Sequence, residues 1–178
     1  MNKNIKYNII AAVDNNNGIG LNNTLPWRCK NDLKQFKALT IGDNNNNAII
    51  MGKNTWESLP KKPLPNRLNI VLSKKYNCLT NKDFPYTYFC NSLEQVFQLH
   101  QIKNNELEEC WIIGGESIYK QFINDKRVNN LYITHIDNSY NCDTFFPKIP
   151  PNFSLKAERN IQLENPKAIL KIYKNANL

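Results

Sequence analysis

The sequence predicts an α/β fold in which buried strands alternate with helices. Short apolar runs and segments with helical periodicity follow one another through most of the 178 residues, and this alternation is typical of strand–helix–strand units. Two of the apolar runs end in glycine and lead directly into a helix start. The length suits one ordinary domain with a continuous core, so we predict a single domain over residues 1–178.

The first predicted strand covers residues 5–13, IKYNIIAAV. Its small Ala11 and Ala12 permit close approach of either a flat ligand or a packed helix. Gly18 and Gly20 then bracket a turn, and the loop that follows ends at Pro26, which fixes the direction in which the chain enters Trp27. A glycine-flanked loop of this kind can act as a lid.

A helix is expected to begin near Lys30, because Leu33, Phe36 and Leu39 recur at helical spacing and would face the core. Asp32 lies on the same side, one turn before Phe36. A carboxylate against an apolar wall is costly unless it receives hydrogen bonds or meets a partially positive ligand. On the residues alone, Asp32 has two interpretations: a helix cap in the first turn or part of a binding site.

The middle of the chain repeats the pattern of strand, turn and helix. Residues 48–59, AIIMGKNTWESL, predict a strand that delivers a helix N-terminus, where phosphate can bind, although most such turns bind nothing. Residues 60–75 combine a proline-stiffened rim with a strand, and Arg67 stands where the two meet, a position that usually holds a structural salt bridge. Residues 84–90 predict another strand, and Ser92 caps a helix through Leu99.

The last third of the chain supplies the remaining predicted elements. Residues 109–119, ECWIIGGESIY, form a buried strand, a tight Gly-Gly turn and a helix start. Residues 130–137, NLYITHID, predict a strand in which Thr134 is an ordinary β-branched residue and His135 is structural. Residues 153–173 predict a final hairpin-like pair.

Composition excludes several classes of protein. The net charge of +8 and the pI near 9.2 favour an anionic partner, but the lysines are scattered without a recognisable nucleic-acid module, so no nucleic acid is expected. Two His and five separated Cys argue against a metal site or a disulfide framework and suit a reducing compartment; the cysteines are Cys29, Cys78, Cys90, Cys110 and Cys142. No apolar run is long enough to span a membrane and no signal-peptide core is evident, so we expect a soluble, cytoplasmic protein.

Five separated blocks between Ile9 and Pro147 resemble, in the same order, motifs of the dihydrofolate reductase family. They are LPW with an acidic residue five positions after the Trp, MGKNTWESL, PLPNRLNIVLS, IGGESIY and YITHID. The spacing and the use of Asp resemble the bacterial members. The resemblance implies a sheet of about eight strands, mostly parallel with an antiparallel edge and with helices on both faces. It also implies NADPH-dependent reduction of 7,8-dihydrofolate to 5,6,7,8-tetrahydrofolate, by hydride transfer from nicotinamide C4 to pterin C6.

The resemblance assigns roles to the substrate side. Asp32 would pair with the pterin and favour protonation of N5 through a water that Trp27 helps to place, Thr134 would hydrogen-bond Asp32 and keep it ionised, and Tyr119 would reach toward the nicotinamide. Arg67 would hold the α-carboxylate of the glutamate tail. The implied substrate-binding residues are Ile10, Ala11, Asp32, Leu33, Phe36, Leu59, Leu64, Arg67 and Ile113.

For the cofactor, the resemblance implies that Lys53, Ser73 and Lys74 hold a 2′-phosphate, which favours NADPH over NADH, and that a cis Gly-Gly bond opens the helix beside the pyrophosphate. Glu116 departs from the family pattern, because a carboxylate there repels a diphosphate unless it points outward. The implied cofactor-binding residues are Ala12, Ile19, Gly20, Leu25, Gly52, Lys53, Asn54, Thr55, Leu72, Ser73, Lys74, Gly114, Gly115, Ser117, Ile118 and Tyr119.

The implied small-molecule partners are dihydrofolate and antifolate inhibitors. The resemblance also allows an association with thymidylate synthase, either fused to the chain or bound to it. Two other functions stay open. Another reductase of the same fold family could act on a ribosylated pyrimidine or pterin without a tail clamp, and a non-enzymatic module could retain the same pockets.

Overall fold

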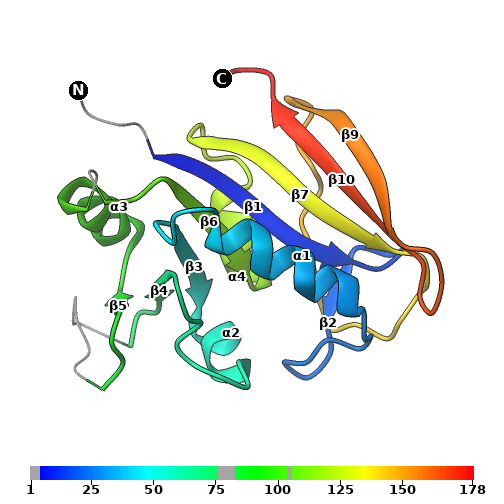
Figure 1. Cartoon of the computed structure of the whole chain (residues 1–178), viewed down its shortest axis with the longest axis horizontal. Helices are drawn as coiled ribbons and strands as arrows, with labels where there is room; N and C mark the ends of the chain where they lie inside the picture. Colours follow the sequence, from blue (N-terminus) through cyan, green and yellow to red (C-terminus); the bar gives the residue numbers. More distant parts are fainter. Residues whose placement is uncertain (1–4, 76–82, 104–105) are drawn as a thin grey trace.

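The computed structural model describes residues 5–75, 83–103 and 106–178, and an eight-stranded sheet with the order β5–β4–β3–β6–β1–β7–β10–β9 forms its centre (Figure 1). Neighbouring strands from β5 to β7 run parallel, and β10 is antiparallel to both β7 and β9. The predicted mostly parallel sheet with an antiparallel edge is therefore confirmed. The strands are β1 (Lys6–Val13), β3 (Ala48–Gly52), β4 (Leu68–Leu72), β5 (Thr87–Cys90), β6 (Glu109–Gly114), β7 (Val128–Ile136), β9 (Phe153–Gln162) and β10 (Ala168–Asn175).

Helices cover both faces of the sheet, as predicted. Helices α1 (Lys30–Ile41) and α2 (Lys53–Ser58) lie on one face, while α3 (Leu93–Ile102) and α4 (Glu116–Phe122) lie on the other. Figure 1 shows α1 crossing in front of the sheet and α4 behind it. A hydrophobic core lies on each face of the sheet, and alternate residues of β3 point into one or the other. Ile49 packs with Trp56 of α2, whereas Ile50 packs with Phe122 of α4. Strands buried on both faces have the continuous apolar sequence seen here.

Most predicted boundaries agree with the structure, and two need correction. The strand predicted at residues 84–90 begins only at Thr87, because Tyr86 adopts a positive φ of 54°, which breaks the extended chain. The helix that Ser92 caps continues beyond Leu99 to Ile102, and the Ser92 side chain accepts a hydrogen bond from the Gln95 N–H as predicted.

A second, two-stranded sheet was not predicted. Strands β2 (Gly18–Gly20) and β8 (Thr144–Phe145) pair antiparallel with Gly18 opposite Phe145 and Gly20 opposite Thr144. We call this pair the lid sheet, because β2 begins the loop that the sequence analysis interprets as a lid, residues 18–27. Strands of two or three residues show no periodicity, so their pairing depends on the tertiary fold rather than on a local signal.

The thiols of Cys29, Cys90, Cys110 and Cys142 are free, and Cys78 lies outside the described residues. Within the described ranges, no group of three or more His, Cys, Asp or Glu side chains is arranged to hold a metal ion. No helix in this part of the chain has the length and apolar character needed to cross a membrane.

Candidate active site

A cleft of about 1020 Å³ opens where the C-terminal half of β1, helices α1 and α2, the β6–α4 turn and the lid sheet meet. Seven of the residues predicted on the substrate side line it: Ile10, Ala11, Asp32, Leu33, Phe36, Leu59 and Ile113. Twelve of those predicted on the cofactor side also line it: Ala12, Ile19, Gly20, Leu25, Gly52, Lys53, Asn54, Thr55, Leu72, Gly115, Ser117 and Tyr119. The fold thus brings residues from separate blocks of the sequence to one cavity.

Asp32 reaches the cleft from the first turn of α1 and is partly buried there. The helix cap position belongs to Cys29, so Asp32 is not the N-cap residue. Burial raises the pKa of the Asp32 carboxyl, while a side-chain hydrogen bond with Thr134 lowers it. Thr134 acts in the predicted direction but burial outweighs it, so Asp32 is protonated more readily than an ordinary aspartate. That Thr134 keeps Asp32 ionised stays a prediction.

Strand β7 places Thr134 behind the cleft wall. Its backbone pairs with Ala12 of β1, and its side chain is buried with 2% exposure. Trp27 is similarly withdrawn: it is 7% exposed, its ring lies 5.4 Å from that of Tyr140, and it does not line the cleft. Of the four residues predicted to be catalytic, only Asp32 and Tyr119 therefore face the cavity directly.

One wall of the cleft is apolar and comes from α1. Phe36 is partly buried, but Leu33 is 51% exposed at the cleft rather than packed into the core, which corrects the predicted inward face of this helix. Helical spacing therefore identifies the correct side of the helix without guaranteeing that each residue on it contacts the sheet.

Arg67 lies behind Phe36 rather than in the cleft lining. Its guanidinium carbon is 5.9 Å from the centre of the Phe36 ring, Nη1 donates to Thr40 Oγ1 at 2.7 Å, and Nε donates to the Pro65 carbonyl at 3.1 Å. The side chain is 5% exposed, and burial lowers its pKa. No carboxylate among the described residues forms an ion pair with Arg67, so the structural salt bridge that is usual at such a position is not found. Leu64, the neighbouring predicted residue, packs in the same core as Phe36.

The floor of the cleft is the turn between β6 and α4. The Gly114–Gly115 peptide bond is cis, as the resemblance implied, and Gly114 has a φ of +114°. A Cβ atom at Gly114 would lie 3.0 Å from the Tyr119 phenol. The Tyr119 hydroxyl lies 2.8 Å from the Ile10 carbonyl and 2.9 Å from the Ile113 carbonyl, and donates its proton between them. Burial raises the pKa of Tyr119, so its hydroxyl stays a donor.

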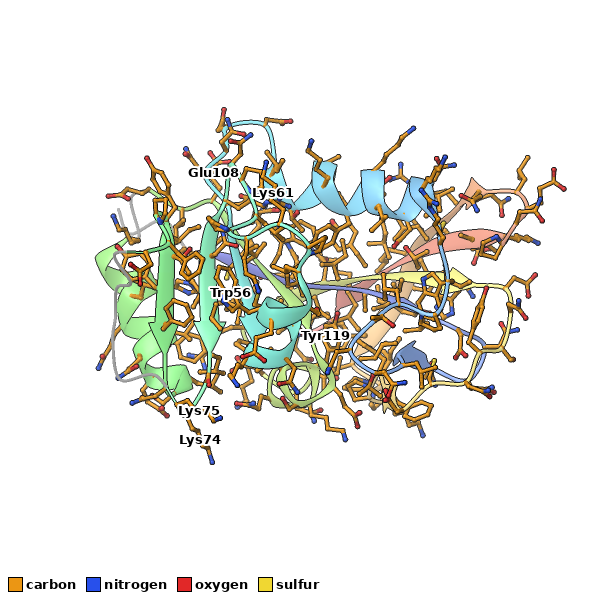
Figure 2. All side chains as sticks on the ribbon, turned by 90° about the horizontal axis from the view of Figure 1, so that it is seen from below. Trp56, Lys61, Lys74, Lys75, Glu108 and Tyr119 are labelled. Atoms are coloured by element: carbon orange, nitrogen blue, oxygen red, sulfur yellow. The ribbon has the colours of Figure 1, made fainter. Side chains whose placement is uncertain are left out.

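Four residues predicted on the cofactor side do not line the cleft: Ser73, Lys74, Gly114 and Ile118. Ile118 packs against Gly52, which lines the cleft, because a Cβ added at Gly52 would lie 3.0 Å from the Ile118 side chain. Ser73 and Lys74 follow the end of β4, and Figure 2 shows Lys74 at the margin of the molecule, well away from Tyr119. Lys53 lines the cleft and forms an ion pair with Glu57 at 3.0 Å.

Seven further residues line the cleft without a predicted role: Asn23, Thr24, Ser58, Pro60, Glu116, Lys120 and Thr144. Ser58 and Pro60 flank Leu59, and Lys120 follows Tyr119, so adjacency to the motifs could have identified them. Thr144 carried no such signal, because the lid sheet brings it to Gly20 from a distant part of the chain.

A family model described as dihydrofolate reductase matches residues 6–174. The chain belongs to the dihydrofolate reductase family. The match spans the lid, the cleft and both sheets, and the fold predicted from the resemblance agrees with it. The bacterial-type spacing around Asp32 stays a prediction.

Individual relatives include insect, viral and plant proteins. The chain is 41% identical over 155 residues to a dihydrofolate reductase of Drosophila melanogaster, covering 84% of this chain and 83% of that protein. It is 41% identical over 161 residues to a viral dihydrofolate reductase of Saimiriine herpesvirus 2, covering 85% and 73%. A bifunctional dihydrofolate reductase-thymidylate synthase of Arabidopsis thaliana is 36% identical over 151 residues, which cover 80% of this chain but 26% of that protein.

Proposed function

We propose that the cleft binds 7,8-dihydrofolate beside NADPH and that residues 1–178 act as one reductase domain. Membership of the family assigns the chain the reduction of dihydrofolate to tetrahydrofolate, a step that supports one-carbon metabolism and thymidylate synthesis. The observation that carries the site assignment is the partly buried Asp32 carboxyl in a cleft with an apolar wall. Such a group can hold a flat nitrogen heterocycle through its N–H edge.

On the substrate side, Asp32 would accept hydrogen bonds from the 2-amino group and N3 of the pterin. The bound heterocycle favours the ionised carboxylate, and this pairing in turn favours protonation of the pterin at N5. Trp27 Nε1 is buried and has no hydrogen-bond partner among the described residues. A buried, unpaired donor can hold an ordered water. Although Trp27 does not itself line the cleft, we propose that such a water bridges it to the substrate and delivers the N5 proton.

The glutamate tail would extend from the pterin along Phe36 toward Leu64 and Arg67. The Arg67 guanidinium is fixed by Thr40 and Pro65, so little side-chain entropy remains to be lost when it pairs with a carboxylate. Its burial lowers its pKa, and an anionic partner would compensate for that desolvation.

The other half of the cleft fits a dinucleotide. Glycines let the backbone approach a flat or anionic ligand: a Cβ at Gly115 would meet Thr55 Oγ1 at 3.4 Å, so a larger residue would narrow the cavity. Lys53, Thr55 and Ser117 supply a cation and hydroxyls along this wall. We propose NADPH rather than NADH, with Lys53 near the 2′-phosphate and with Ser73 and Lys74 completing that site from the end of β4. When bound, the reduced nicotinamide supplies the hydride that C6 of the pterin accepts.

The test is the loss of NADPH absorbance when dihydrofolate is added to the purified protein. We expect loss that depends on both compounds, stops when an antifolate is added, and is slower with NADH. A ribosylated pyrimidine substrate in place of dihydrofolate is the comparison that separates this reductase from its fold relatives. No absorbance loss with dihydrofolate, or equal rates with both substrates, would overturn the assignment.

We propose a cytoplasmic enzyme that works with thymidylate synthase, either joined to it, as the name of the Arabidopsis relative states for that protein, or as a separate chain. Co-sedimentation of the purified chain with thymidylate synthase tests the second arrangement. Independent sedimentation of the two proteins would contradict it.

A further inference from the structure

Glu116, the first residue of α4, is held by contacts on both of its carboxylate oxygens. Oε2 accepts a hydrogen bond from the Phe145 N–H at 3.0 Å, and Oε1 pairs with the Lys120 ammonium one turn along the same helix. The Lys120 bond and then the Phe145 bond hold the pKa of Glu116 below its usual range, so the group is ionised at neutral pH. Both Glu116 and Lys120 line the cleft.

The Phe145 bond connects α4 to the lid sheet. Phe145 lies in β8, which pairs with β2 at the start of the lid, residues 18–27. Two further bonds continue the connection: Thr144 Oγ1 donates to the Gly20 carbonyl at 3.3 Å, and the Asn22 N–H donates to Asp143 Oδ2 at 2.9 Å. A single carboxylate on α4 therefore reaches the segment from which the lid extends.

An ionised glutamate in this position has an electrostatic cost. The proposed NADPH would bring a diphosphate to the same wall, beside Gly115 and Ser117, and like charges repel. Lys120 offsets part of that repulsion by pairing with the carboxylate. The compensating gain is the charged hydrogen bond to Phe145, since such bonds are stronger than neutral ones.

We propose that Glu116 is a positioning residue that clamps β8, and with it the base of the lid, against the start of α4, so that the lid is held over the cofactor half of the cleft. This inference rests on the proposed NADPH site. It goes beyond the residues that the family resemblance assigns, because there Glu116 counted only as a departure that would repel the diphosphate.

Two substitutions separate the hydrogen bond from the charge. Glu116→Ala removes both, whereas Glu116→Gln keeps an oxygen that can accept the Phe145 N–H and removes the negative charge. Glu106→Ala is the matched control, because Glu106 pairs with Lys103 in another surface ion pair outside the cleft lining. The readouts are the NADPH dissociation constant from fluorescence quenching and the hydrogen exchange rate of the Phe145 amide in ligand-free protein.

For Glu116→Ala we expect Phe145 exchange and the NADPH dissociation constant each to rise about fivefold, the scale of one lost hydrogen bond. Glu116→Gln keeps a neutral and therefore weaker acceptor, so Phe145 exchange should rise less than in Glu116→Ala, and NADPH should bind more tightly than in Glu116→Ala. Glu106→Ala should change neither value.

Three results would overturn the clamp: unchanged Phe145 exchange in Glu116→Ala, NADPH binding in Glu116→Ala that is as tight as in the unsubstituted protein or tighter, or a loss in Glu116→Gln equal to that in Glu116→Ala. Failure of the unsubstituted protein to bind NADPH would instead refute the proposed function. The Phe145 exchange rates would still test the link between α4 and β8, because they need no ligand.

Discussion

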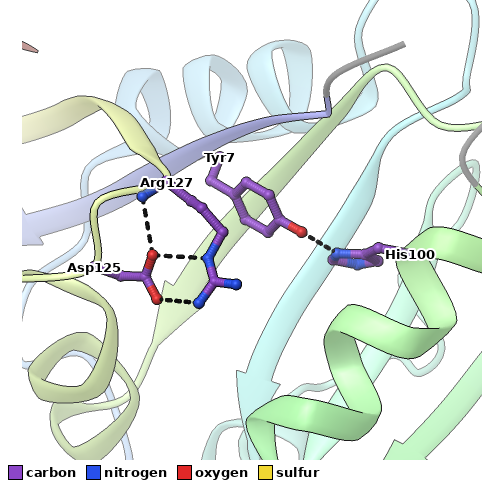
Figure 3. A network of polar contacts seen from close by, with 4 residues as sticks. All are labelled: Tyr7, His100, Asp125 and Arg127. Atoms are coloured by element: carbon purple, nitrogen blue, oxygen red, sulfur yellow. Dashed lines mark hydrogen bonds and ion pairs between the residues drawn. The ribbon is translucent and has the colours of Figure 1, made fainter. Parts of the chain in front are cut away.

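Asp32 and His100 are both titratable side chains withdrawn from solvent, but they lie in different surroundings. Asp32 faces a cleft, whereas His100 is 3% exposed on the other side of the sheet. The His100 Nδ1 lies 2.6 Å from the Tyr7 hydroxyl (Figure 3). Its Nε2 lies 3.7 Å from Cys110 Sγ. Burial raises the pKa of Asp32 and lowers the pKa of His100 to about 4, so in each case it favours the neutral form.

Tyr7, which bonds His100, is itself buried, and its ring contacts that of Phe97. The guanidinium carbon of Arg127 lies 3.5 Å from the centre of the Phe97 ring, and Arg127 forms two side-chain hydrogen bonds with Asp125. Figure 3 shows Arg127 and Asp125 beside Tyr7. A shifted pKa is thus common to both regions, and access to a cavity is what distinguishes a candidate catalytic group from a structural one. The following substitutions test that distinction.

The largest expected effect is that of Asp32→Asn on turnover. We expect kcat at pH 7 to fall by roughly 10² or more, because the acid–base contribution of the carboxylate is lost, while NADPH binding is retained. Asp32 has a raised pKa in the folded state, so its ionisation at neutral pH costs folding stability, and Asp32→Asn should be at least as stable as the unsubstituted protein. Asp137→Asn, at an exposed position, is the control for steady-state kinetics and thermal unfolding. Full turnover in Asp32→Asn would remove Asp32 from the mechanism.

His100 should instead control the pH dependence of stability. Its folded-state pKa of about 4 lies below the ordinary value, so the unfolded chain binds more protons as the pH falls from about 6.5 toward 4, and stability is lost over that range. This one group should account for about 2 kcal/mol between pH 7 and pH 5. In urea unfolding, His100→Gln should lose about 2 kcal/mol less of its free energy of unfolding between pH 7 and pH 5 than the unsubstituted protein. Its kcat at pH 7 should be unchanged. An equal dependence of the unfolding free energy on pH in the two proteins would show that burial does not lower the pKa of His100.

Arg67 sharpens the comparison, because it is a buried charge that adjoins the cleft without lining it. Arg67→Ala should raise the KM for dihydrofolate roughly tenfold, the scale of a charged hydrogen bond, with a much smaller fall in kcat. Arg67→Lys keeps a charge but not the planar fork and should recover only part of the loss. For dihydropteroate, which lacks the glutamate tail, the KM should hardly change. An equal rise for both substrates would mean that Arg67 only supports the fold.

The smallest expected effect is that of Tyr7→Phe. Removing the hydroxyl leaves His100 Nδ1 without its partner and should lower the free energy of unfolding by about 1 kcal/mol, with kcat unchanged. Tyr86→Phe is the control, because Tyr86 is 78% exposed and no hydrogen bond is lost to a buried group. A fall in kcat without a fall in stability would place the Tyr7–His100 pair in the catalytic machinery and contradict the comparison.

The sequence predicted those parts of the fold and the site that local patterns encode. The apolar runs of β1, β3 and β6 identified buried strands, the Ser92 cap identified the start of α3, and the motif resemblance brought Asp32, Lys53 and the Gly114–Gly115 turn to one cleft. The function of each of these residues stays a prediction.

Features that depend on contacts between distant residues could not be predicted in this way. The lid sheet joins Gly20 to Thr144, and the Glu116 bond to Phe145 exists only because that sheet forms. The net pKa shift of Asp32 depends on how deeply the cleft buries it, which the helical period does not reveal. Leu33 is a second example, because helical spacing predicts the side of α1 on which it lies but not that it is 51% exposed.

The most direct test of the account is a carbon-13 NMR titration of the Asp32 carboxyl, with and without a diaminopteridine antifolate. In the free protein we expect a pKa above that of an ordinary aspartate, and in the complex a marked fall, because the ligand's N–H edge stabilises the ionised carboxylate. An ordinary pKa that the ligand leaves unchanged would contradict the assignment of Asp32 as the group that binds the heterocycle.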